Sequence, residues 1–144
     1  MSGRKLAFAG LLMVLAAPSG ALAQKYRVVV HQDHPTNSIE RKDLANIFLG
    51  IRTKWDSGTV VTPVEQSLRS TVRANFAKEI LKRSPSAVLE YWKRELHRGT
   101  KRPPAVKGTD REVIAFVASK PGAIGYVSAA GQVDETVKTL EITG

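Results

Sequence analysis

Residues 67–73 contain the strongest candidate for binding chemistry in this sequence, a run of hydroxyl and guanidinium side chains. They are Ser67, Arg69, Ser70, Thr71 and Arg73. Where such residues open a helix, its free N–H groups and the positive end of its dipole also favour an anion. The run therefore predicts a site for phosphate or a similar small oxyanion. The alternative is a well-capped helix whose arginines lie in solvent, and residue chemistry leaves both interpretations open.

The predicted site lies where a strand runs directly into a helix. Residues 59–65 are rich in β-branched side chains, which favour a strand, and Pro63 suits a strand edge or end. Ser67 is the expected N-cap of the helix that follows. Beyond it, apolar residues recur at every fourth position, the spacing that places side chains on one helix face: Leu68, Val72, Phe76 and Ile80.

The rest of the sequence alternates between short strands and amphipathic helices. Strands are predicted at residues 25–31, 123–127 and 137–142. One helix is predicted at residues 39–49, with Ser38 as its cap, and another at residues 85–97. The second has an apolar face formed by Val88, Tyr91, Trp92 and Leu96. A last helix follows the capping box of Thr109 and Glu112. The order β-α-β-α-α-α-β-β predicts the α/β class, a small mixed sheet flanked by helices.

No other pattern in the sequence predicts catalysis, a metal or a cofactor. His31 and His34 on an extended chain point to opposite faces, and no third ligand is close in sequence. No serine has the Gly-x-Ser-x-Gly setting, and no acidic pair has the spacing of a general acid and base. The absence of cysteine excludes disulfides and thiolate chemistry. A non-enzymatic protein is therefore expected.

Residues 1–23 have the three-part layout of a cleaved secretory signal. Arg4 and Lys5 precede an apolar run over residues 6–17, and small residues surround the expected cleavage after Ala23. The run is shorter than the roughly 20 residues of a membrane-spanning helix. The expected mature chain, residues 24–144, is one domain in the periplasm or outside the cell, without a transmembrane segment.

The formal net charge of +9 favours anionic partners. Nucleic acid is not expected as a partner of an exported protein. The basic side chains that follow residue 92 predict a solvated face or, alternatively, a docking patch for an acidic partner. They are Lys93, Arg94, His97, Arg98, Lys101 and Arg102.

Three stretches of the sequence resemble the phosphate-binding periplasmic proteins of ABC transporters, which have the type II binding-protein fold. These stretches are residues 43–50 with the following Trp55, the strand that ends at Pro63 and Val64, and residues 121–127, PGAIGYV. The resemblance covers most of residues 28–127 and implies a single lobe of that fold. It also implies that residues 70–72 correspond to the Ser-Gly-Thr phosphate loop of the family. Ser70 is retained, whereas Thr71 replaces the glycine and Val72 the threonine.

The resemblance implies a solute-binding protein that holds phosphate or a similar oxyanion weakly. Binding is expected to be weak because the loop glycine and the opposing lobe of the family are both missing. A homodimer that pairs two lobes would supply a second wall to the site. The alternative is a non-catalytic interaction module of the cell envelope, which kept the fold and binds an envelope protein through the basic residues 93–102.

Overall fold

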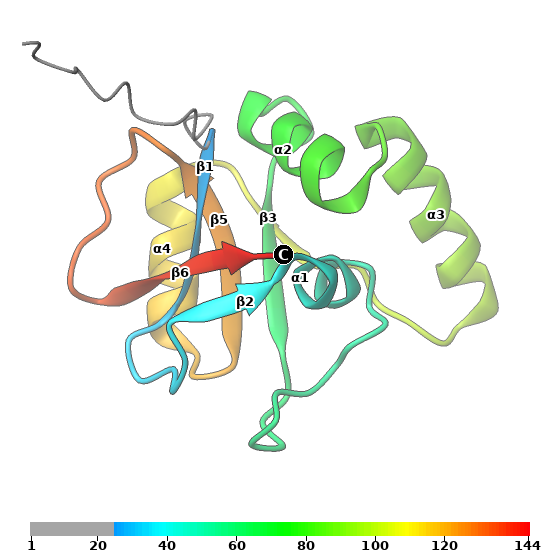
Figure 1. Ribbon diagram of the computed structural model, residues 1–144. Coiled ribbons are helices and arrows are strands. Elements are labelled where there is room, and N and C mark those ends of the chain that lie inside the picture. The colour runs from blue at the N-terminus through cyan, green and yellow to red at the C-terminus, as the bar shows by residue number, and fades with distance from the viewer. Residues whose placement is uncertain (1–24) are drawn as a thin grey trace, which may run out of the picture.

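The computed structural model describes residues 25–144, and the predicted signal segment lies outside this part of the chain. One six-stranded sheet is flanked by helices on both faces (Figure 1). The strands are β1 (Tyr26–His31), β2 (Ser38–Glu40), β3 (Thr62–Gln66), β4 (Ala105–Lys107), β5 (Ala123–Ser128) and β6 (Val137–Thr143). The helices are α1 (Arg41–Phe48), α2 (Thr71–Phe76), the π-helical η1 (Ala77–Leu81), α3 (Pro85–Arg98) and α4 (Asp110–Ser119). The predicted α/β class is confirmed.

The sheet is mixed, with the strand order β2-β6-β1-β5-β3-β4. Strand β1 is antiparallel to both of its neighbours, β5 and β6. The other described pairs, β2 with β6, β3 with β4 and β3 with β5, are parallel. The carboxyl ends of β3, β4 and β5 therefore meet the amino end of β1 at one edge. Ligands of open α/β sheets bind outside this kind of edge.

Strand β1 separates two hydrophobic layers, because alternate side chains of a strand point to opposite faces. Val28 and Val30 pack with the aromatic cluster beneath α1, α2 and α3, which includes Phe48 and Phe76. Val29 packs on the other face, against the helix α4. All three valines are at most 1% exposed, so the predicted buried strand at residues 25–31 is confirmed.

Two short strands, β2 and β4, are missing from the sequence prediction. The predicted helix at residues 39–49 begins at Arg41 with Glu40 as its N-cap, because residues 38–40 pair with β6 instead. Ser38 is therefore a strand residue and not a helix cap. Strand β4 owes its conformation to its pairing with β3. A strand of three residues has too little pattern of its own to be predicted.

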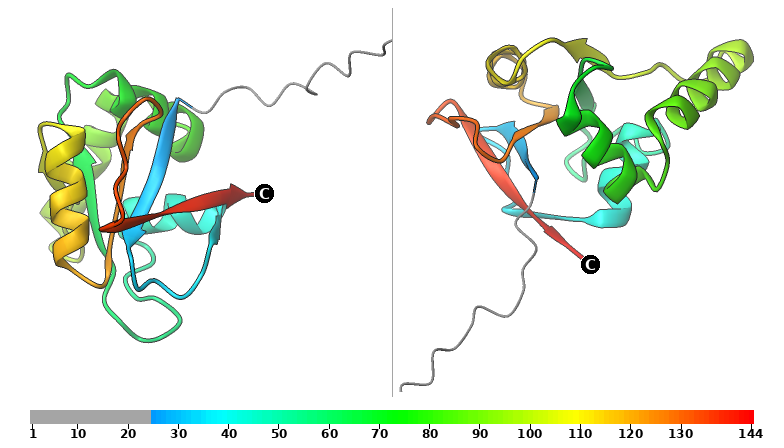
Figure 2. Two further views of the ribbon diagram at one scale, coloured as in Figure 1. Left: turned by 90° about the vertical axis from the view of Figure 1, so that its left-hand side faces the viewer. Right: turned by 90° about the horizontal axis from the view of Figure 1, so that it is seen from above.

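The helix α3 extends away from the sheet at one end of the molecule (Figure 2). Its predicted bounds and its serine cap are confirmed, since Ser84 accepts a hydrogen bond from the N–H of Ala87. The prediction that Leu96 belongs to the apolar face of this helix is wrong. Leu96 is 55% exposed, while the neighbouring Glu95 is buried and lies within ion-pair distance of Arg98 and Lys101.

The sequence motifs that carry the family resemblance meet in space. The indole N–H of Trp55 donates to the carbonyl oxygen of Gly122 at 3.0 Å, which joins the loop before β3 to the start of β5. A Cβ atom at Gly122 would lie 2.0 Å from the carbonyl oxygen of Val60, so only glycine fits there. Phe48 of α1 lies 5.7 Å from the ring of Tyr126 in β5. These residues form a structural joint between α1, β3 and β5.

Candidate functional site

The predicted anion site occupies the β3–α2 junction, at the carboxyl edge of the sheet. The helix α2 begins at Thr71, and its N-cap is Ser70, whose Oγ accepts from the N–H of Arg73 at 3.4 Å. The prediction of Ser67 as N-cap is wrong. The carbonyl oxygen of Ser67 instead accepts from the N–H of Ser70 at 3.0 Å, which closes a turn before the helix. Leu68 lies in that turn and is 52% exposed.

Four of the five predicted ligands lie on or beside this turn. Arg69 and Thr71 are exposed, and Ser67 and Ser70 are half-buried. The first N–H groups of a helix have no intrahelical acceptor, so those of Thr71 and Val72 are available to a bound group. The turn thus presents hydroxyls, N–H groups and one guanidinium at the sheet edge.

The fifth predicted ligand, Arg73, points into the protein beneath the turn. Its guanidinium is buried, lies 3.2 Å from a carboxylate oxygen of Glu65 and donates to the carbonyl oxygen of Gln66 at 2.9 Å. Glu65 is equally buried, and burial raises the pKa of its carboxyl while the charge of Arg73 opposes that rise. Arg73 therefore fixes the end of β3 from inside, and Arg69 is the more accessible of the two arginines.

A chain of hydrogen bonds behind the turn joins three further residues that the sequence did not indicate. The Ser70 hydroxyl donates to the amide oxygen of Gln66 at 3.2 Å, and the amide nitrogen of Gln66 donates to Asp110. Asp110 in turn accepts from the backbone N–H and the hydroxyl of Ser128. We call Gln66, Ser70, Asp110 and Ser128 the edge network. It ties the end of β3 to the end of β5 and the start of α4.

The edge network holds the Asp110 carboxyl in its charged form. Burial by itself would raise the pKa of Asp110, but the hydrogen bonds from Ser128 and Gln66 and the charge of Arg27 outweigh it and lower the pKa. Arg27, at the amino end of β1, also donates to the carbonyl oxygens of Ala129 and Gly131. Sequence reasoning could not find this network, because Asp110 and Ser128 are distant in sequence from each other and from Gln66 and Ser70.

The basic residues after position 92 lie on and beyond the outer part of α3. Some of their charge is neutralised locally, since Lys93 pairs with Glu90 at 3.0 Å and both Arg98 and Lys101 lie near Glu95. Arg94, His97 and Arg102 are exposed. The guanidinium of Arg83 lies over the ring of Tyr91, 4.8 Å from the ring centroid. The resulting surface is positively charged and largely exposed to solvent. We call it the ridge, and it consists of Lys93, Arg94, His97, Arg98, Lys101 and Arg102.

Neither a metal cluster nor a membrane span is found in the described part of the chain. Within residues 25–144, no group of three or more His, Asp or Glu side chains could hold a metal ion. Over the same residues, no helix has the length and apolar character needed to cross a bilayer.

Comparison with protein families gives one match that covers nearly the whole chain, the model of the PBP superfamily domain over residues 24–143. No curated protein matches the chain.

Solved structures with the same fold include a phosphate transport receptor, a phosphate transporter substrate-binding protein and PstS, each from a different organism. An ABC-type phosphate transport receptor from Vibrio cholerae is 20% identical, with a TM-score of 0.65 over 82% of this chain and 46% of its own. A candidate phosphate ABC transporter substrate-binding protein from Clostridium perfringens, with bound phosphate, is 16% identical, with a TM-score of 0.66 over 82% and 44%. PstS from Borrelia burgdorferi is 15% identical, with a TM-score of 0.64 over 83% and 47%. The chain thus spans less than half the length of each.

Proposed function

The chain belongs to the PBP superfamily, and from that premise we propose that it is a periplasmic or secreted solute-binding protein for phosphate or a similar small oxyanion. The proposed site comprises Ser67, Arg69, Ser70 and Thr71, on or beside the β3–α2 turn, with Arg73 beneath it. The observation that carries the proposal is the arrangement of this turn. The turn lies at the carboxyl edge of the sheet, Arg69 and Thr71 are exposed there, and the first N–H groups of α2 have no intrahelical acceptor. The edge network fixes the turn from behind.

Each residue has a distinct role in the proposed site. The N–H groups of Thr71 and Val72 and the hydroxyls of Ser67 and Thr71 would donate to the oxyanion. Ser70, whose one hydroxyl proton is donated to Gln66, would hold the turn in position as the N-cap of α2. Arg69 supplies a positive charge from the exposed side. Arg73, whose charge is paired with Glu65, would position the turn from beneath through its bond to the carbonyl oxygen of Gln66. Such a donor set suits an oxyanion, whose oxygens accept several hydrogen bonds at once.

The affinity is expected to be low, with a dissociation constant on the order of 1 mM. The turn is open to solvent, so water competes for every donor. Thr71 adds a side chain where the phosphate loops of the family, by the resemblance described above, have glycine. A homodimer with two turns facing each other would raise the affinity, and light scattering of the mature chain tests for that dimer.

Calorimetric titration of the mature chain with inorganic phosphate and with sulfate tests the proposal. We expect saturable heat with phosphate that decreases strongly in Arg69→Ala and in Ser70→Ala. Arg94→Ala, on the outer face of α3, is the matched control and should bind as the unmodified chain does. Absence of both heat and a thermal shift at millimolar anion, in a chain with normal circular dichroism, would exclude an anion-binding role.

The ridge on α3 supports a second candidate function, an interaction module of the cell envelope that binds an acidic partner protein. The observation in its favour is that α3 extends from the sheet with an apolar residue, Leu96, exposed among the basic side chains. Recovery of partners from envelope extract should fall when Arg94, Arg98 and Arg102 are all changed to Glu. Equal recovery by this variant and the unmodified chain would argue against the module.

A further inference from the structure

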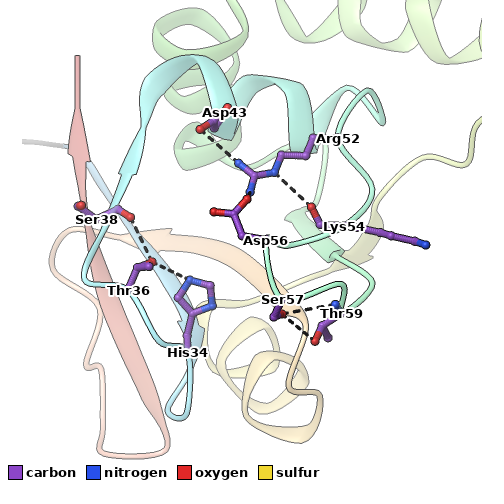
Figure 3. Close-up of polar contacts among 9 residues, drawn as sticks. All are labelled: His34, Thr36, Ser38, Asp43, Arg52, Lys54, Asp56, Ser57 and Thr59. Atoms are coloured by element: carbon purple, nitrogen blue, oxygen red, sulfur yellow. Dashed lines mark hydrogen bonds and ion pairs between the residues drawn. The ribbon is translucent and has the colours of Figure 1, made fainter.

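A polar cavity of about 280 Å³ lies at the opposite end of β3 from the proposed anion site. It is lined mainly by three segments: the β1–β2 connection with β2, the first turn of α1, and residues 52–57, which precede β3. Thr143 at the end of β6 also contributes. Figure 3 shows side chains from these three segments directed toward a common space. The volume is close to the lower limit for small-molecule sites, roughly 300 Å³, and suits a single ring-sized ligand.

One wall of the cavity is formed by the β1–β2 connection, where hydrogen bonds join His34, Thr36 and Ser38. The Thr36 hydroxyl donates to the carbonyl oxygen of Ser38 at 3.3 Å, and the Nε2 of His34 lies 3.0 Å from the same hydroxyl oxygen. Since the one hydroxyl proton is already used, Nε2–H of His34 is the donor in that contact. Burial and the nearby charge of Lys138 lower the pKa of His34, which keeps the imidazole neutral at pH 7.

The other wall presents two carboxylates that Arg52 holds in place. The guanidinium lies 3.2 Å from Asp43 and 2.9 Å from Asp56, and its Nε donates to the carbonyl oxygen of Lys54 at 3.2 Å (Figure 3). Each carboxylate has further lone pairs, because a carboxylate can accept about four hydrogen bonds. Asp56 is fully exposed and Asp43 is 39% exposed, so these lone pairs are accessible.

An immobilised aromatic ring completes the cavity. Trp55 is held by its hydrogen bond to Gly122, and His34 lies edge-on to it at 4.5 Å. Trp55 therefore lines the cavity with an indole whose orientation is fixed by these contacts before any ligand arrives. Ser57 also lines the cavity, and its hydroxyl donates to the hydroxyl of Thr59.

These features select among ligand classes. The cavity has three carboxylates, Glu40, Asp43 and Asp56, against one guanidinium, so an anion would be repelled although the chain as a whole is basic. A cation would compete with Arg52, which already occupies the position between two of the carboxylates and lies 5.8 Å from the centre of the Trp55 ring. A purely apolar ligand would displace water from the remaining carboxylate lone pairs of Asp43 and Asp56 without replacing its hydrogen bonds.

A ligand with many hydroxyl groups and an apolar ring face satisfies all of these constraints. We propose that this cavity binds a single sugar residue, whose hydroxyls donate to Asp43 and Asp56 and whose C–H face packs against Trp55. The residue is either a free monosaccharide or one unit of a glycan, and both offer the same chemistry. The site is separate from the β3–α2 turn and does not depend on oxyanion binding there.

Tryptophan fluorescence tests this proposal, because the chain contains only two tryptophans. In a Trp92→Phe background, Trp55 is the sole reporter. We expect saturable emission changes on titration with D-glucose, N-acetyl-D-glucosamine or the N-acetylglucosamine trimer. A response to the trimer alone indicates a glycan unit, and a response to monosaccharides indicates a free sugar. Either response supports the site.

Two variants give the matched comparison. Asp56→Ala removes a fully exposed carboxylate of the cavity and should weaken sugar binding roughly tenfold or more, the loss expected for a hydrogen bond to a charged group. Asp33→Ala removes a similarly exposed carboxylate. Asp33 precedes His34 but is not part of the cavity lining, so its removal should leave binding unchanged.

Backbone amide shifts of the unmodified chain provide a second measurement, in case Trp92→Phe fails to fold. Sugar-dependent shifts should concentrate at residues 34–38 and 52–57. The proposal is overturned by either of two results: no saturable change in fluorescence or shifts at sugar concentrations on the order of 50 mM, or equal binding by Asp56→Ala and Asp33→Ala.

Discussion

The two ends of β3 use an arginine in opposite ways. At the carboxyl end, Arg73 is buried and pairs with Glu65, while Arg69 and Thr71 are exposed and the first N–H groups of α2 have no intrahelical acceptor. At the amino end, Arg52 is partly exposed and holds two carboxylates whose acceptor oxygens are directed outward. One end is therefore rich in donors and the other in acceptors. Net charge, which is positive for the chain as a whole, predicts only the first of these local surfaces.

The largest expected effect is the loss of stability when Arg73 is removed, compared with removal of Arg69. Arg73→Ala leaves the buried Glu65 without its partner and should lower the free energy of unfolding by about 3–5 kcal/mol. Urea denaturation of the mature chain measures the change. Arg69→Ala, four residues earlier on the exposed side, is the control and should stay within about 0.5 kcal/mol. Similar losses in both variants would contradict a structural role specific to Arg73.

A smaller effect is expected for ligand binding at the carboxyl end. Arg69→Ala should weaken phosphate binding by roughly tenfold, or about 1.4 kcal/mol, since it removes the accessible cation of the proposed site. Arg52→Ala, at the opposite end of β3, should leave phosphate binding unchanged. Calorimetry on both variants provides the test, and a loss of phosphate binding in Arg52→Ala alone would place the site elsewhere.

For Arg52 a still smaller stability effect is expected, because its ion pairs are partly exposed. Arg52→Ala should lower the free energy of unfolding by no more than about 1 kcal/mol. The same change should still abolish sugar-dependent fluorescence, since Asp43 and Asp56 lose the group that orients them. If Arg52→Ala destabilises the chain as much as Arg73→Ala does, the ion pairs at the two ends of β3 do not differ in their contribution to stability, contrary to the comparison above.

The acid sensitivity of the edge network is the last prediction. The folded pKa of Asp110 lies below the usual value, so its stabilising contribution is complete above that value, about 3.9, and is lost as the pH falls through the lower folded pKa. The stability difference between the unmodified chain and Asp110→Asn should therefore shrink as the pH is lowered from about 5 to below 3. Thermal melts across this range measure it. Parallel pH profiles would mean that Asp110 is not held in its charged form.

Sequence patterns predicted the long elements correctly because each contains enough residues to repeat a period. The strands predicted at residues 25–31, 123–127 and 137–142 correspond to β1, β5 and β6 within one residue at each end. The helices predicted after the caps Ser84 and Thr109 correspond to α3 and α4. The strands β2 and β4 escaped prediction because pairing partners, and not their own three residues, define them.

The sequence predicted the location of the polar run between a strand and a helix, but not the start of the helix or the burial of its side chains. The polar run at residues 67–73 does lie at the carboxyl edge, yet the helix begins three residues later than expected and Leu68 is outside it. Burial of Arg73 could not be predicted, because its partner Glu65 extends from a strand whose facing direction depends on sheet register. The role of Thr71 and its neighbours as anion ligands stays a prediction.

The sequence by itself determined the fold class, the family and the position of the polar turn between β3 and α2, since periodicity, capping residues and motifs are local properties. Only the tertiary structure decided which arginine faces inward, which residues form the edge network, and that His34, Asp43 and Trp55 line one cavity. These groupings join residues from separate elements, and packing of the whole sheet brings them together. Local patterns contain no information about such contacts.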